Sequence, residues 1–118
     1  MNRLSITAFA FVTALSFVPA LANEAAVSVS ASAPTSSGDY RVLRMTVAYG
    51  DLDVTKADGA ATLLDRIEHA SRLVCGERAG YTMSDARTKI FNACRARATH
   101  YAIEAVGAPQ LTQVAAAR

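Results

Sequence analysis

The sequence predicts a small α+β domain, mostly helical, with one β-strand followed by a two-helix hairpin clamped by a disulfide and a short C-terminal helical turn. Apolar residues alternate over residues 40–49, which is the period of a strand with one buried face. In two later segments they recur at steps of three and four residues, which is the period of a helix. Two cysteines, Cys75 and Cys94, fall on these two helical segments. We therefore place the domain at residues 39–118.

The first 22 residues indicate that the chain is exported. Arg3 supplies a positive start, residues 4–18 form an apolar run, and Ala20-Leu21-Ala22 is the small-residue pattern that a signal peptidase accepts. We expect cleavage between Ala22 and Asn23. A retained membrane anchor is the alternative, but this run is shorter than the roughly 20 residues needed to span a bilayer. The mature protein is therefore expected to be periplasmic or secreted, with no membrane span after cleavage.

Composition limits both the size of the core and the kind of partner. Removal of residues 1–22 from the 118-residue chain leaves enough for one small domain, and the chain contains no Trp. Without Arg3, the mature chain has 11 Lys and Arg against 10 Asp and Glu. This balance gives no electrostatic reason to expect nucleic acid or an anionic membrane as a partner.

Residues 23–38 are predicted to be a flexible leader. They are rich in Ala, Ser, Val and Thr, and they end in a segment that turns easily, with Pro34 and Gly38. Residues 26–30 alternate between apolar and small polar side chains, so a short strand is an alternative there. The clearer strand runs from Tyr40 to Tyr49 and ends at Gly50-Asp51.

The first helix is expected to begin at Thr55 and to run to about Cys75. Thr55 followed by Asp58 resembles a capping box, and Gly76 suits the left-handed position after a helix. One face of this helix is predicted to be buried. Its residues are Ala60, Leu63, Leu64, Ile67, Ala70, Ser71 and Val74.

The second helix is expected to begin at Ser84 and to end at Val106, before Gly107 and Pro109. Residues 110–116 are expected to add a short helical turn, with two apolar side chains pointing inward. The residues predicted to line the inner face of the second helix are Phe91, Cys94, Ala98, Tyr101, Ala102 and Ala105.

The two cysteines are predicted to form a structural disulfide. An exported chain with an even number of cysteines favours oxidation. The bond would close a loop of 19 residues, for which the loss of chain entropy in the unfolded state predicts about 3 kcal/mol of stabilisation. The alternative is a small thiol-redox or other envelope enzyme that uses Cys75 and Cys94, although redox pairs are usually spaced as C-x-x-C.

The sequence supplies no strong catalytic, metal or cofactor motif. Asp51, Asp53 and Thr55 have the spacing that opens a calcium loop, but the sixth position is Lys56 and the twelfth is Thr62, where Gly and Glu are needed. The two histidines, His69 and His100, form no H-x-x-x-H or H-E-x-x-H pair. Neither a nucleophile elbow nor a phosphate-binding or dinucleotide glycine loop occurs. We therefore expect no metal site, no cofactor and no enzymatic activity.

Two features could bind a partner. The second helix is locally basic, and the residues responsible are Arg87, Lys89, Arg95 and Arg97. A solvated helix face is the alternative interpretation of these charges. The single strand would have an unpaired edge, which could pair with the region of Ala26, with another copy of the chain, or with another protein.

Several segments resemble the UrcA family, a group of small exported bacterial proteins whose function is not established. The resemblance covers most of the mature chain. It is carried by residues 47–53, which contain Asp51-Leu52-Asp53, by residues 59–64, Ile67 and Ala70, by residues 74–76, by Cys94 and by residues 105–111. The chain departs from the family at Gly107-Ala108-Pro109, where other members have an Asn before the final pair. The resemblance implies an exported, disulfide-bonded helix hairpin and no catalytic residues. The resemblance leaves the function open. Because the sequence carries no strong catalytic, metal or cofactor motif, we expect an exported, non-enzymatic envelope module that binds a protein or another envelope component.

Overall fold

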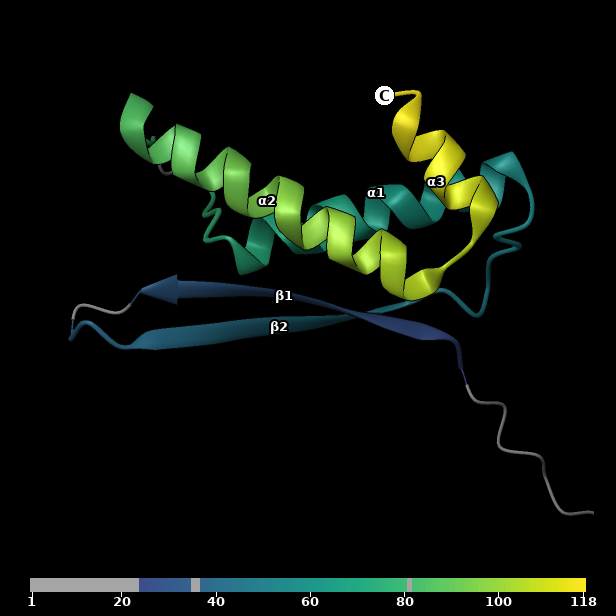
Figure 1. Ribbon diagram of the computed structural model, residues 1–118, viewed down its shortest axis with the longest axis horizontal. Helices are drawn as coiled ribbons and strands as arrows, with labels where there is room; N and C mark the ends of the chain where they lie inside the picture. Colours follow the sequence, from purple (N-terminus) through teal and green to yellow (C-terminus); the bar gives the residue numbers. More distant parts are fainter. Residues whose placement is uncertain (1–23, 35–36, 81) are drawn as a thin grey trace, which may run out of the picture.

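The computed structural model describes residues 24–34, 37–80 and 82–118 (Figure 1). The predicted signal peptide and its cleavage site, Ala22 and Asn23, lie outside these residues. Two strands precede three helices. The elements are β1 (Ala26–Pro34), β2 (Tyr40–Ala48), α1 (Ala57–Val74), α2 (Asp85–Val106) and α3 (Pro109–Ala116).

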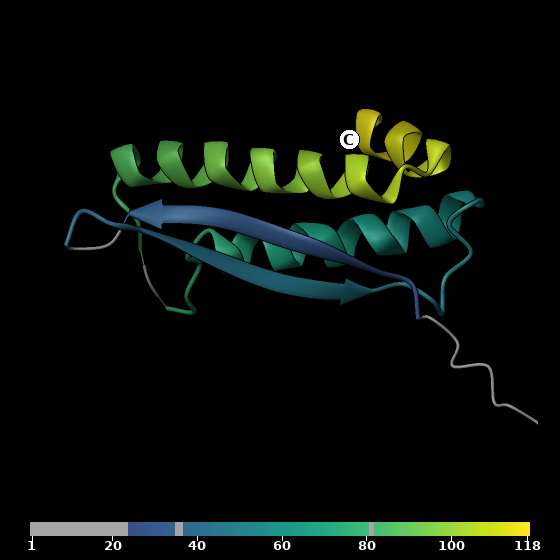
Figure 2. The ribbon, with the colours of Figure 1, turned by 60° about the horizontal axis from the view of Figure 1, so that its bottom comes forward.

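The two strands form an antiparallel hairpin, with Val27 opposite Val47 and Val29 opposite Met45. The helices lie against one face of this hairpin, and none of the three described helices lies on its other face (Figure 2). α1 packs against both strands, whereas α2 packs against β1. α3 packs against α1. The buried apolar residues form one cluster between these layers: Val27, Val29, Val47, Ala60, Leu63, Leu64, Ile67, Ala70, Val74, Ala98, Ala102 and Leu111.

The predicted fold class is confirmed in outline, but the described residues form two strands where one was expected. β1 lies within the segment predicted to be a flexible leader, and it spans more than the residues 26–30 that were considered as a short strand. Val29 is fully buried and Val27 nearly so. The leader prediction is therefore wrong for residues 26–34. Burial of these two valines against the helices removes apolar surface from water and so stabilises the segment as a strand packed on the core.

α1 begins one residue later than the capping-box pattern predicts, since that pattern makes Thr55 the N-cap. The helix N-cap is Lys56, and no side chain caps it. Thr55 is turned away from the helix, since both its backbone N–H and its hydroxyl donate to Asp53 Oδ1 (3.1 and 2.5 Å). The helix ends as predicted, with Cys75 at its C-cap and Gly76 in the left-handed region (φ 96°).

The boundaries predicted for the second helix are confirmed. The Ser84 side chain accepts a hydrogen bond from the N–H of Arg87 (3.4 Å) at the N-terminus, and Gly107 ends α2 in the left-handed region (φ 66°). Pro109 begins α3, whose fully buried Leu111 packs into the core. A hydroxyl pair joins α1 to α2, because Thr99 Oγ1 donates to the buried Ser71 Oγ (2.9 Å).

The predicted inner face of α2 is confirmed only in part, since Phe91 and Cys94 are half-buried and Ala105 is exposed. Only Ala98 and Ala102 are buried on this helix, and Tyr101, predicted to be in the core, is 61% exposed. The physical reason is the narrow sheet. Adjacent strands lie about 4.8 Å apart, whereas packed helices need about 8–10 Å each, so two helices side by side are wider than a two-stranded hairpin. Part of α2 therefore extends past the edge of β1.

Candidate interaction site

Cys75 and Cys94 form the predicted disulfide. Their sulfur atoms are 2.08 Å apart and their Cα atoms 5.9 Å apart. The bond connects the C-terminus of α1 to the middle of α2, and both residues are half-buried. Cys94 also lies at the surface groove described below.

The acidic segment before α1 is engaged in structural contacts. Arg66 Nη1 and Nη2 donate to the two carboxylate oxygens of Asp51 (2.8 and 2.7 Å). The hydrogen bond to Arg66 lowers the pKa of Asp51, while the same contact raises the pKa of Arg66. Asp53 holds Thr55, as described above. Among the described residues, no group of three or more His, Cys, Asp or Glu side chains could hold a metal ion.

Each histidine contacts a side chain of its own helix. His69 Nδ1 lies 3.4 Å from Arg72 Nη2, and His100 Nε2 lies 3.3 Å from a carboxylate oxygen of Glu104. Both are exposed contacts within one helix. These side chains therefore belong to the solvated faces of α1 and α2.

The outer edge of β1 presents unpaired backbone groups. The N–H of Tyr49 donates to the C=O of Ala25 (2.8 Å), so these two opposite residues form a hydrogen-bonded pair of the antiparallel ladder. Hydrogen-bonded pairs occur at every second residue of an antiparallel ladder. Ser28, Ser30 and Ser32 therefore direct their N–H and C=O groups away from β2. Outside the ladder, no backbone hydrogen bond within the described ranges involves these three serines.

A groove lies between this edge and α2. Its volume is about 400 Å³. The β1 side supplies Ser30, Ala31 and Ser32, and the α2 side supplies Ile90, Ala93, Cys94, Arg97, Ala98 and Tyr101. Ile90 is 72% exposed, so most of a large aliphatic side chain faces solvent at this groove. The groove is thus apolar on its helical wall, with a guanidinium group beside the apolar residues.

The edge of β2 differs from that of β1. Arg66 Nη1 donates to the C=O of Ala48 (2.9 Å) and so occupies one acceptor of this edge. The strand also carries Arg41 and Arg44, and charged side chains on an edge oppose pairing with a further strand. β1 contains no charged residue. Of the two edges, β1 is therefore the one suited to accept another strand.

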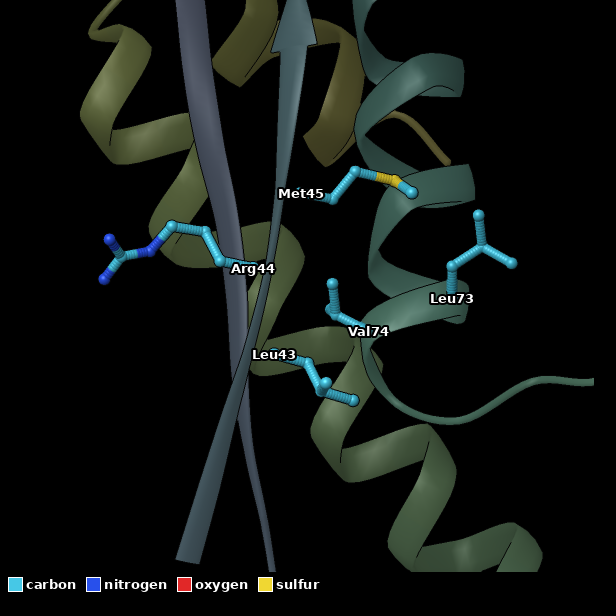
Figure 3. Close-up of a pocket in the computed structure, with 5 residues that line it drawn as sticks. All are labelled: Leu43, Arg44, Met45, Leu73 and Val74. Carbon is cyan, nitrogen blue, oxygen red and sulfur yellow. The ribbon is translucent and has the colours of Figure 1, made fainter.

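A smaller hollow lies between β2 and α1. It measures about 190 Å³ and is lined by Leu43, Arg44, Met45, Leu73 and Val74. Figure 3 shows the Met45 side chain directed toward α1 and the Arg44 side chain directed to the opposite side of the strand. Because Met45 and Leu73 are each nearly two-thirds covered, this hollow offers less apolar surface than the groove at β1.

The four basic residues singled out in the sequence do not form one patch. Arg97 lines the groove. Arg87 precedes Ile90 by three residues, so it lies on the same side of α2, near the N-terminal end of the groove. Arg95 is half-buried on a different face of α2. Lys89 directly precedes Ile90 in the sequence, so its side chain is turned about 100° around the helix from that of Ile90. None of the ion pairs found among the described residues includes any of the four.

None of the described helices is sufficiently long and apolar to cross a membrane.

Sequence reasoning identified the disulfide and Arg97 but missed Ile90, Ala93 and the outward serines of β1 as parts of one site. The alternation over residues 26–30 was the only available signal for the serines. No family model, no curated protein and no solved structure matches this chain.

Proposed function

We propose that the chain is an exported, non-enzymatic module of the cell envelope, periplasmic or secreted and of the UrcA type, that binds another envelope component at the groove between β1 and α2. The observation that carries this proposal is the open edge of β1 beside exposed apolar side chains of α2. Open strand edges and exposed apolar patches are both typical of interaction sites. The disulfide supports export, because oxidised cysteine pairs are characteristic of compartments outside the cytoplasm.

Site-specific photo-cross-linking in the intact envelope tests this proposal. A photoreactive amino acid replaces Ala93, which lines the groove, and in a matched variant it replaces Ala96, which is also exposed on α2 but does not line the groove. We expect a cross-linked product of discrete mass from position 93 and none from position 96. Equal products from both positions, or none from either, would contradict the proposal.

The thiol-redox alternative has a separate test. A redox enzyme would keep one sulfur accessible to alkylation at a low thiol pKa. We expect the protein recovered from the envelope to begin at Asn23 and to take up no alkyl group at Cys75 or Cys94 until it is reduced. Alkylation without reductant would favour thiol chemistry over the binding function.

A further inference from the structure

We propose that the groove accepts an extended segment of a partner protein, which adds to the hairpin as a third strand beside β1 and places a carboxylate near Arg97. This inference rests on the binding function proposed above and specifies the chemistry of the partner. It follows from three properties of the site: its backbone groups, its shape and its charge.

The backbone groups at the β1 edge match those of a strand. Ser28, Ser30 and Ser32 each present one N–H donor and one C=O acceptor to solvent along the same edge. These groups alternate at the spacing of a β-ladder, so an extended peptide can satisfy all of them at once. Their side chains are small and lie on the face away from the helices, where they leave the approach to the edge open.

The shape of the groove provides room for the side chains of the added strand. α2 extends past β1, and its exposed Ile90 and Tyr101 lie above the position that a third strand would occupy. Every second side chain of that strand would point toward α2. Apolar side chains there would cover Ile90 and Tyr101, as the core side chains of the hairpin cover α1.

The charge of the Arg97 side chain favours an acidic partner segment over a second copy of this chain. Arg97 lines the groove without a carboxylate partner among the described residues, so an acidic side chain complements it. A second copy of this chain would bring a β1 strand with no acidic residue. Antiparallel pairing of β1 with its copy would also place two α2 helices over the same face of adjacent strands, which are too closely spaced for two helices. A partner segment with alternating apolar residues and one acid fits better.

The test uses the disulfide-bonded chain, labelled with ¹⁵N, and synthetic ten-residue peptides that alternate Val and Thr. One peptide carries Glu at a central position on the Val face, and its control carries Lys at that position. We expect saturable shifts of the Ser28, Ser30 and Ser32 amide signals, with the Glu peptide binding roughly threefold to fivefold more tightly. Absence of saturable shifts with either peptide would overturn the inference.

Two further peptides test strand pairing directly. Each is the Glu peptide with N-methyl groups on one of its two alternating sets of amides. Only one set can face β1, so methylation of that set should abolish binding while methylation of the other set should preserve it. If both sets or neither set abolishes binding, the peptide does not bind as an added strand.

Variants of the protein test the two groups that the inference names. Arg97→Glu should reverse the preference so that the Lys peptide binds more tightly, whereas Arg95→Glu on another face should leave the preference unchanged. Ser30→Pro removes an outward N–H without disturbing the ladder to β2, since Pro is tolerated on strand edges. It should reduce binding at least tenfold, and Ser30→Ala should not. Retained binding in a folded Ser30→Pro variant would contradict strand addition.

The remaining outcomes separate this inference from the broader proposal. A cross-link at position 93 without binding of either peptide would retain the binding function and refute an extended acidic partner. A dimer in sedimentation velocity that Ser30→Pro abolishes would identify the occupant as a second copy of this chain and would also refute the inference.

Discussion

Gly59 lies where the first turn of α1 comes closest to the turn before it. A Cβ atom at this position would collide with the backbone carbonyl of Asp53. That carbonyl oxygen already accepts a hydrogen bond from the N–H of Lys56 (3.2 Å), so it has little freedom to move. The sequence pattern assigned Gly59 no special role, because only the folded chain brings Asp53 against it.

We predict that Gly59→Ala destabilises the domain by about 1–3 kcal/mol, the usual effect of overpacking. Intrinsic helix propensity alone predicts the opposite, since Ala is favoured over Gly in helices by about 1 kcal/mol. The free energy of unfolding in urea distinguishes the two.

Gly50→Ala is the matched control, because the closest atom that its new Cβ would meet is the Cγ of the exposed Glu24 side chain (3.2 Å). We expect a much smaller loss of stability for this variant. A stabilised Gly59→Ala variant would show that the approach to Asp53 is looser than described.

At the scale of the element, the two long helices differ in how well the sequence predicts their buried faces. α1 has a continuous apolar face, so both its span and its buried residues were predictable. α2 carries Ala, Arg and Thr on several sides, so its caps, Ser84 and Gly107, located its ends, while its inner face was identified only at Ala98 and Ala102. Where the residue pattern does not distinguish the faces, the disulfide and the width of the sheet decide which one is inside.

This dependence makes the disulfide important for α2. We predict that the double variant Cys75→Ser, Cys94→Ser loses about 3 kcal/mol of stability, because the unfolded chain regains the freedom of the 19-residue loop. The midpoint of urea unfolding measures this loss, and the parent chain treated with reductant should show the same decrease. An unchanged midpoint would mean that packing at Ala98 and Ala102 alone holds the helix.

At the scale of the whole molecule, the hairpin is the part that the sequence described least well. β2 was predictable from its large alternating side chains, whereas β1 consists of Ala, Ser, Val and one Pro, a composition also typical of flexible segments. Its strand conformation depends on pairing with β2 and on burial under both helices. The groove could not be predicted for the same reason, since it exists only once β1 is in place beside α2.

The whole fold should therefore depend on β1. We predict that Val29→Asp strongly lowers the midpoint of thermal unfolding, because a charge buried at a fully covered position costs about 3 kcal/mol or more, a large part of the roughly 5 kcal/mol at the low end for folded domains. Ser30→Asp, on the exposed face of the same strand, is the control and should remain folded. Circular dichroism during heating measures the thermal unfolding of both variants. Equal stability of the two variants would restore the flexible-leader interpretation.

The bond between Cys75 and Cys94 encloses the connection between α1 and α2, including the exposed Arg78, within a covalent ring. A protease that cuts the backbone once within this ring, after Arg78 for example, leaves both products joined through the sulfur atoms. The nicked protein therefore keeps the mass of one chain plus one water molecule, and it separates into two fragments only when it is reduced. Partial degradation would then go undetected on a non-reducing gel.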